Sequence, residues 1–534
     1  MSIRWERLSS DEDWSRLRAA IDLNGQNEAV RQVLQSARNL GTLSVVIEDD
    51  YLDQDFTVEF SAFYSKVFKR YSKSCRRLHF FSSDVETALT NPDPQCVASG
   101  LTKISNAGSY IGYVVSRPVD HAPLGRVVLK CPQSPDKMKS DLLVRTELRT
   151  HLLGATLKVV GATFTQQDSR IGACAQAAIW MLARHFNSKH HGVPWVSTVD
   201  ITEAATKPTD HLLSLSLPAG SEGLTIDNMV RALRAIGQIP LVYVSASQAN
   251  GNSHWPGTMR PGAIIHRYVD SGIPVILGLK PWEKNVTDFH AVVVTGHTIR
   301  LLDDAAALPP EPTRSEFCGY FLVNDDQRGT NLRLPIRAQD PLAETPYDLS
   351  HVEYIILALP AKVFIPAETA EKLAWDLIGI YSAEWPTLKA EYASGLGQSV
   401  PAGDAFVQSV KEGNIIARTY LTYGWRYKER LLRNSCSRSV KNAVVEQDFP
   451  RFVWVTEFAT RSSFNQLDET SIKISSHVVI DATSSPYWEG RCIFHAPGFV
   501  LRWYHNPNDP TGPYLDSLAV VPDECSYNMK IRGS

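Results

Sequence analysis

Apolar residues change between helical and strand spacing along the chain, and this pattern separates three segments. The first segment covers residues 1–145 and mixes both kinds of spacing. It predicts helices over 28–40 and 56–71, and strands over 43–47, 110–118 and 125–130. We therefore expect an α+β domain at the N-terminal end of the chain.

The second segment, residues 146–365, places helices first and strands second. Its pattern predicts a strand over 157–160, a helix that begins near residue 174, and further helices over 197–205, 225–236 and 261–269. Strands are then expected over 239–244, 274–279, 289–295, 320–324 and 354–359. Helices followed by antiparallel strands are typical of an α+β domain.

The third segment, residues 366–534, repeats this order without a motif that indicates chemistry. We expect helices over 367–381, 403–412 and 415–433, then strands over 452–458, 474–481, 492–495 and 499–504. The length of 534 residues also favours several domains. The sequence thus predicts three α+β domains with boundaries near residues 145 and 365.

Composition and charge narrow the class of protein. Hydrophobic residues make up 43% and charged residues 21%, and the formal net charge is −3. This balance gives no reason to expect nucleic acid or an anionic membrane as the main partner. The charged N-terminus lacks the apolar region of a secretory signal, and no apolar run approaches the roughly 18 to 20 residues of a membrane span. We expect a cytoplasmic protein.

The helix predicted after residue 172 is apolar on nearly all of its surface, so it should be buried. Cys174 lies in its first turn, behind a polar loop at residues 165–172. Unsatisfied N–H groups and the positive end of the helix dipole favour a thiolate at such a position. The same N–H groups can stabilise an oxyanion. A small buried structural cysteine is the alternative interpretation.

A cysteine nucleophile needs a base, a group that orients the base, and an oxyanion donor. His290 begins a predicted strand, and His297 is the alternative base. Residues 324–326, Asn-Asp-Asp, end the next strand, which an antiparallel pairing brings beside the start of the His290 strand. Gln166 or Gln167 could supply a side-chain amide beside Cys174. The eight cysteines are scattered, with no spacing typical of zinc ligands, so we expect no metal or cofactor.

Taken together, this order of residues resembles the papain-like cysteine peptidases. It is most similar to the double-glycine leader peptidases that process bacteriocin precursors, over residues 160–335. The stretches 223–237 and 271–276 resemble segments of that branch as well. The resemblance implies a papain-like core with Cys174 as nucleophile, His290 as general base and acid, Asp325 as orienting acid and a glutamine as oxyanion donor. Gln167 lies seven residues before Cys174 (174 − 167 = 7), which fits the family spacing better than Gln166.

Three features differ from that branch. Ala175 stands where the family usually has glycine, no ATP-binding cassette or P-loop follows, and the flanking segments are unlike it. We therefore expect an intracellular peptidase that acts on a protein or peptide, with flanking domains that either select the substrate or hold partner proteins. A papain-like acyltransferase, as in the phytochelatin-synthase branch, and a non-catalytic papain-like assembly subunit remain alternatives.

Overall fold

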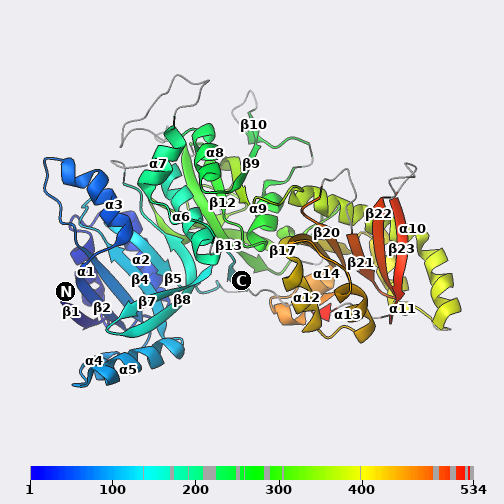
Figure 1. Ribbon diagram of the computed structural model, residues 1–534, viewed down its shortest axis with the longest axis horizontal. Helices are drawn as coiled ribbons and strands as arrows, with labels where there is room; N and C mark the ends of the chain where they lie inside the picture. Colours follow the sequence, from blue (N-terminus) through cyan, green and yellow to red (C-terminus); the bar gives the residue numbers. More distant parts are fainter. Residues whose placement is uncertain are drawn as a thin grey trace.

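The computed structural model arranges the chain in three parts that follow one another along the long axis of the molecule (Figure 1). The N-terminal part is drawn in blue and cyan, the middle part in green, and the C-terminal part in yellow to red. The structure describes residues 2–135, 137–168, 173–190, 192–207, 224–247, 253–257, 259–281, 289–303, 306–338, 340–396, 399–484, 492–505, 513–523 and 527–528.

The N-terminal part is built on a seven-stranded antiparallel sheet in the order β1-β2-β3-β4-β5-β8-β7. Its strands are β1 (Ile3–Arg7), β2 (Ser44–Tyr51), β3 (Cys75–Phe81), β4 (Tyr110–Ser116), β5 (Leu124–Leu129), β7 (Thr146–Leu152) and β8 (Ala155–Phe164). The first sheet therefore extends to residue 164, past the domain boundary expected near 145. The hairpin of β7 and β8 belongs to this sheet because β8 pairs with β5.

The helices of the N-terminal part are mostly, but not all, capped by polar side chains. They are α1 (Asp11–Ile21), α2 (Glu28–Asn39), α3 (Gln54–Ala62), α4 (Glu86–Leu89) and α5 (Pro94–Asn106), with a 3₁₀ turn η1 (Tyr64–Lys66). The side chains of Ser10, Asn27 and Asp53 accept hydrogen bonds from the first turns of α1, α2 and α3. The helix predicted over 56–71 was too long, since α3 ends at Ala62 and the chain leaves helical geometry after η1.

The middle part contains a second antiparallel sheet in the order β15-β14-β13-β12-β16-β9. Its strands are β9 (Ile239–Val244), β12 (Val275–Leu279), β13 (His290–Arg300), β14 (Cys318–Asp325), β15 (Gly329–Pro335) and β16 (Val352–Leu359). An additional strand, β6 (Met138–Leu142), pairs with β13. The helices are α6 (Cys174–Lys189), α7 (Thr198–Thr206), α8 (Ile226–Ala235) and α9 (Pro261–Asp270), with a short ladder of β10 (Ala246–Ser247) and β11 (Ser253–His254). The 3₁₀ turns are η2 (Arg314–Phe317) and η3 (Leu349–His351).

The helix α6 is the buried centre of the middle part. Residues 175–186 are all buried, as the apolar pattern predicted. One side of α6 packs against β13 of the second sheet, and the other contacts β7 and β8 of the first. At the N-terminal interface the indole nitrogen of Trp180 donates to Asp55, and Arg184 forms an ion pair with the same carboxylate. The two sheets thus fix the position of α6 from both sides.

The C-terminal part combines a six-stranded antiparallel sheet, β17-β18-β20-β21-β22-β23, with helices on its faces. The strands are β17 (Ile415–Tyr423), β18 (Phe452–Thr460), β20 (Ser476–Asp481), β21 (Cys492–Ala496), β22 (Phe499–His505) and β23 (Pro513–Val520), and β19 (Lys473–Ile474) pairs with β24 (Tyr527–Asn528). The helices are α10 (Ala367–Leu396), α11 (Pro401–Lys411), α12 (Gly424–Leu432), α13 (Arg438–Val445) and α14 (Arg461–Phe464), with a 3₁₀ turn η4 (Glu469–Ser471).

The helix predicted over 415–433 was wrong in its first half. Residues 415–423 form β17, which pairs with β18 along its whole length, and only 424–432 are helical. Eight of the nine residues of β17 are buried, so both of its faces are covered and its sequence lacks the alternation of a half-exposed strand. The helix predicted over 367–381 continues to Leu396 as α10, through Pro386.

The expected α+β class is confirmed, since helices and antiparallel sheets occur in all three parts. Among the residues that the structure describes, none of the helices is both long and apolar enough to cross a lipid bilayer.

Candidate active site

Cys174 is the first residue of α6 and is half-buried. The preceding residue, Ala173, occupies the N-cap position and has no side-chain oxygen to accept from the N–H groups of the first turn. The side chain of Gln176 instead accepts a hydrogen bond from the Ala173 N–H at 3.0 Å. The N–H groups of the first helical turn therefore lack the usual side-chain cap and can donate hydrogen bonds to an anionic group.

His290 and Asp325 meet because β13 and β14 run antiparallel. Val293 of β13 pairs with Asn324 of β14, which brings the first residue of β13 beside the last residue of β14. The Nε2 of His290 lies 3.0 Å from Oδ1 of Asp325. His290 is only 5% exposed and Asp325 is fully buried. The contact anticipated from the strand order is present.

The side chain of His290 also forms a hydrogen bond with the side chain of Cys174. Since Asp325 contacts Nε2, the other ring nitrogen, Nδ1, is the one available to the sulfur. The alternative base, His297, lies seven residues farther along the same strand, about 23 Å away at the usual rise. Its Nε2 instead contacts Oδ1 of Asp270 at 2.9 Å. The structure thus joins Cys174, His290 and Asp325 in one chain of hydrogen bonds.

Several donors converge on the buried carboxylate of Asp325. Its Oδ1 accepts from the backbone N–H groups of Gln327 and Arg328 at 3.0 and 3.2 Å, and its Oδ2 accepts from the Tyr347 hydroxyl at 2.6 Å. Burial acts to raise the pKa of Asp325. The charge and hydrogen bond of His290, together with the hydrogen bonds from Tyr347 and Gln327, outweigh burial and lower this pKa overall. Asp325 is therefore held as a carboxylate in the interior.

The pKa of His290 is shifted in the opposite direction. Burial lowers the pKa of the imidazole, but the charge and hydrogen bond of Asp325 and the hydrogen bond of Cys174 outweigh burial and raise it well above its ordinary value. This shift favours the protonated form of the ring. A protonated ring carries a positive charge beside the sulfur of Cys174, to which it is hydrogen-bonded.

The neighbours of Asp325 in the Asn-Asp-Asp stretch have other roles. The Oδ1 of Asn324 accepts from Thr330 and from the Asn331 N–H, and its amide donates to the Thr163 carbonyl, so Asn324 joins the two sheets. Asp326 is buried, with one oxygen 3.8 Å from Nε2 of His290. Burial raises the pKa of Asp326 to about 7, the charge of Asp325 adds to this, and His290 opposes it.

The structure separates the two candidate glutamines. The side-chain oxygen of Gln166 accepts from the Leu124 N–H at 3.2 Å, and its amide donates to Asn27 at 3.1 Å. Both polar atoms of the Gln166 side chain are thus hydrogen-bonded to residues of the N-terminal part. Gln167 is half-buried and lines a cavity of about 10 Å³ together with Ala173 at the start of α6. Gln167 stays the predicted oxyanion donor, because both polar atoms of the Gln166 side chain are engaged elsewhere.

Tyr347 and the backbone of residues 327 and 328 were missed in the sequence. All three support Asp325, but Tyr347 comes from a loop between β15 and η3 that carries no periodic pattern. The turn after Asp325 could have been anticipated, because aspartate commonly accepts from the N–H groups two and three residues ahead.

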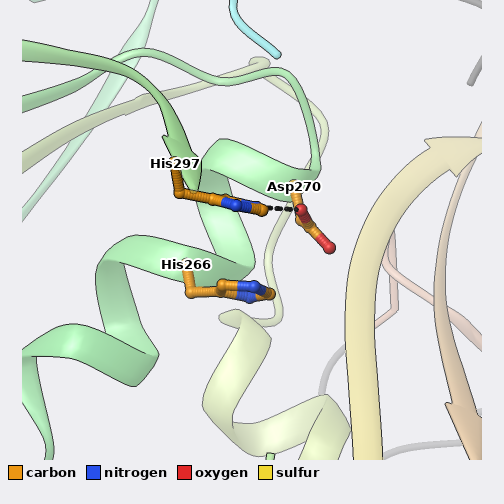
Figure 2. A group of neighbouring side chains, drawn as sticks. All are labelled: His266, Asp270 and His297. Atoms are coloured by element: carbon orange, nitrogen blue, oxygen red, sulfur yellow. Dashed lines mark hydrogen bonds and ion pairs between the residues drawn. The ribbon is translucent and has the colours of Figure 1, made fainter. Parts of the chain in front are cut away.

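Two groups of side chains have the composition of metal ligands. His290, Asp325 and Asp326 form one, and His266, Asp270 and His297 form the other (Figure 2). In the first, Asp325 already accepts from three protein donors besides His290, which leaves it little capacity for a metal. In the second, the other oxygen of Asp270 forms an ion pair with Arg418 at 2.6 Å, so the site already has a cation.

Residues 169–172 and 282–288, which directly precede the Cys174 and His290 stretches, lie outside the described residues. A scan against protein-family models finds no match to this chain, and a search of curated protein sequences finds no match either.

Proposed function

We propose that this protein is a cysteine peptidase with a papain-like core, in which Cys174, His290 and Asp325 form the catalytic triad. One observation carries the proposal: the buried imidazole of His290 is hydrogen-bonded to a thiol at a helix N-terminus and to a carboxylate at once. A structural cysteine needs neither a base nor an oriented ring. The core would comprise α6 and the sheet that contains β13 and β14.

The proposed reaction begins with the thiolate of Cys174 attacking the carbon of a peptide or isopeptide carbonyl. The electron pair of the C=O bond moves to oxygen, and the resulting oxyanion is stabilised by N–H groups at the start of α6 and by the amide of Gln167. When the tetrahedral intermediate collapses, the C–N bond breaks and the His290 imidazolium protonates the leaving amine. A thioester on Cys174 remains.

The neutral imidazole of His290 then removes a proton from water, which attacks the thioester. Collapse of the second tetrahedral intermediate releases the carboxylic acid and restores the thiolate and imidazolium. Asp325 stays ionised throughout. Its role is to hold the ring and to stabilise its positive charge, which four donors to the carboxylate make possible.

The cysteines and the flanking parts bear on the compartment and the substrate of the proposed peptidase. None of the seven cysteines within the described residues forms a disulfide, which suits a reducing compartment such as the cytoplasm. The N-terminal and C-terminal parts are large enough to select a protein substrate or to bind a partner.

Covalent labelling by a peptide carrying a thiol-directed electrophile tests the proposal. The wild-type protein should be labelled at Cys174, and Cys174→Ala should lose this label together with hydrolysis of a peptide library. We expect hydrolysis to fall by a factor on the order of 10⁴ or more. His290→Ala should also lose hydrolysis and should slow the labelling of Cys174, while Cys174→Ala should unfold near the wild-type temperature.

Product analysis in ¹⁸O-labelled water identifies the acceptor. Incorporation of one label into the new carboxyl group indicates hydrolysis, as we expect. Transfer of the acyl group to an added amine without label would identify an acyltransferase instead. Unchanged labelling and turnover in Cys174→Ala would overturn the proposed nucleophile.

A further inference from the structure

The chain leaves β8 at Phe164, and α6 begins ten residues later at Cys174 (174 − 164 = 10). The two elements lie side by side in the structure (Figure 1). Gln167, the predicted oxyanion donor, stands on the loop between them and outside every helix and strand that the structure describes. A group that stabilises a transition state has to be held within about 0.5 Å of its productive position, so other contacts must fix this loop.

Gln166, directly before Gln167, is held by the N-terminal part through both its main chain and its side chain. Its N–H donates to the Leu124 carbonyl at 3.2 Å, and its carbonyl accepts from Nη2 of Arg117 at 2.9 Å. Its side chain accepts from the Leu124 N–H at 3.2 Å and donates to Asn27 at 3.1 Å. Arg117 and Leu124 stand at the two ends of the connection between β4 and β5. This connection therefore supports the loop before Cys174.

Arg117 is itself fixed from several sides, and its side chain is only 4% exposed. Its Nε and Nη2 donate to the Ala122 carbonyl at 3.1 and 2.9 Å, which closes the β4–β5 connection on itself. Its Nη1 pairs with Glu59 of α3 at 3.1 Å, and Glu59 also accepts from the Thr198 hydroxyl of α7 at 2.7 Å. The support is thus rigid and is tied to the middle part as well.

Asp168, directly after Gln167, is held by the same connection. Nε2 of His121 lies 2.8 Å from Oδ1 of Asp168, whose side chain is almost completely buried. The carbonyl of His121 accepts from Asn27 at 3.3 Å. The residues on both sides of Gln167 are therefore fixed by the N-terminal part, while Gln167 itself lines a cavity together with Ala173 at the start of α6.

We propose that the β4–β5 connection, residues 117–123, positions Gln167 for the oxyanion, and that His121 is a positioning residue that acts through Asp168. The inference rests on the proposed function, because it gives the N-terminal part a role in the same reaction. His121 takes no part in proton transfer. The N–H groups at the start of α6 still stabilise the oxyanion when this support is lost, so the loss of rate is partial.

Two reagents separate oxyanion stabilisation from the reactivity of the thiol. With p-nitrophenyl acetate, the thiolate attacks the acetyl carbon, an oxyanion forms, and the C–O bond breaks to release p-nitrophenolate and leave an acetyl thioester. Iodoacetamide alkylates the same thiolate by displacing iodide, without an oxyanion. Peptide mass spectrometry of the full chain measures both rates at Cys174, and Cys174→Ala gives the background release of p-nitrophenolate.

His121→Ala should slow the acylation of Cys174 by at least about tenfold and change its alkylation by less than about twofold. His121→Phe, which keeps a ring without nitrogen, should behave in the same way. His121→Gln should restore most of the acylation rate, because its amide can still donate to Asp168. In a Gln167→Ala background, His121→Ala should slow acylation further by less than about twofold, since both residues act through one interaction.

His151→Ala provides the matched control, because it removes another exposed histidine of the N-terminal part. His151 contacts Thr156, eight residues before the end of β8 at Phe164 (164 − 156 = 8) and thus about 26 Å along the strand from the loop. Both rates should stay at the wild-type values. His121 is 38% exposed, so its variants should fold, and thermal unfolding checks each of them.

The positioning role is overturned if the two variants that remove the His121 nitrogen, His121→Ala and His121→Phe, acylate as fast as the control. It is also overturned if acylation and alkylation fall by the same factor in these variants. A different result would contradict the proposed nucleophile: release of p-nitrophenolate that is equal in the wild type and in Cys174→Ala. That outcome would overturn the peptidase proposal and, with it, the role of His121.

Discussion

Two adjacent carboxyl groups, Asp325 and Asp326, occupy the same buried site with opposite shifts of pKa. Donors from His290, Tyr347 and the backbone keep Asp325 ionised. For Asp326, burial and the charge of Asp325 raise the pKa to about 7. Two carboxylates this close seldom both ionise at low cost. Asp326 thus adds a pH-sensitive group next to the imidazole without being part of the hydrogen-bonded triad.

Asp326→Asn should reduce the pH dependence of stability. Between about pH 4 and 7 the folded wild type retains a proton on Asp326 that the unfolded chain has released, so stability falls as pH rises through this window. The variant lacks this loss, on the order of 2 kcal/mol between pH 5 and 8. Urea unfolding of both proteins at pH 5 and pH 8 measures this difference in the free energy of unfolding. An unchanged difference between the two pH values would contradict the raised pKa.

At the scale of elements, the site residues could be predicted because strand order and chain direction bring them together. Cys174, His290 and Asp325 each stand at the end of an element, and antiparallel pairing alone brings the ends of β13 and β14 into contact. Tyr347 could not be predicted, because its loop position depends on how the chain returns from β15 to the sheet.

The strand β17 illustrates why local pattern fails for some elements. Its sequence, IIARTYLTY, is followed directly by the helical GWRYKERLL, and a strand covered on both faces lacks alternation. Its β-branched and aromatic residues favour a strand, but helical spacing across the boundary between β17 and α12 obscured this preference. Pairing with β18 decides the conformation, and that contact is distant in sequence.

The junction of β6 with β13 offers a test at this scale. Gly296 of β13 pairs with Leu142, and a Cβ at Gly296 would lie 2.1 Å from the Asp141 carbonyl oxygen. Gly296→Ala should therefore force the two strands apart and destabilise the protein by about 1–3 kcal/mol, measured by chemical denaturation.

Gly379→Ala is the matched control for that substitution. Gly379 lies exposed in the middle of α10, with nothing within 4 Å of the added Cβ. Alanine there should stabilise the helix by about 0.5–1 kcal/mol. Equal effects of the two substitutions would mean that β6 does not pack against β13 as closely as described.

At the scale of the whole molecule, the segment boundaries expected near residues 145 and 365 differ in how well they match the sheets. The second falls in the connection between β16 and α10, whereas the first separates β6 from the hairpin of β7 and β8. β6 joins the second sheet, and the hairpin returns to the first. Which sheet a strand joins depends on its pairing with strands distant in sequence, and periodicity within one segment cannot reveal that pairing.

Buried ion pairs connect the middle and C-terminal parts. Arg418 of β17 contacts Asp270 of α9 at 2.6 Å and Glu457 of β18 at 3.0 Å, and all three are almost fully buried. Arg418→Met would leave two carboxylates in the interface without their cation. We expect a loss of about 3–5 kcal/mol in the free energy of unfolding, measured by calorimetry.

Arg433→Met serves as the control, since Arg433 forms an exposed pair with Glu429 within one helical turn and at its end. Its loss should cost less than about 0.5 kcal/mol. If the two arginine variants unfold at the same temperature, the interface between the two parts does not depend on the buried network.

We propose that His290 activates the thiol of Cys174. A second cysteine of the same chain, Cys96, can be compared with Cys174. Both cysteines lie in the first turn of a helix, α6 and α5, but Cys96 is exposed and its sulfur contacts the Asp93 carboxylate at 3.3 Å. A carboxylate disfavours a thiolate and an imidazolium favours it. The two thiols therefore differ chiefly in their charged partner.

Site-resolved alkylation at pH 6, followed by peptide mass spectrometry, measures this difference most directly. Iodoacetamide should modify half-buried Cys174 at least ten times faster than exposed Cys96, and His290→Ala should remove the advantage without changing the rate at Cys96. A wild-type rate at Cys174 equal to or below that at Cys96, unchanged in His290→Ala, would contradict the account.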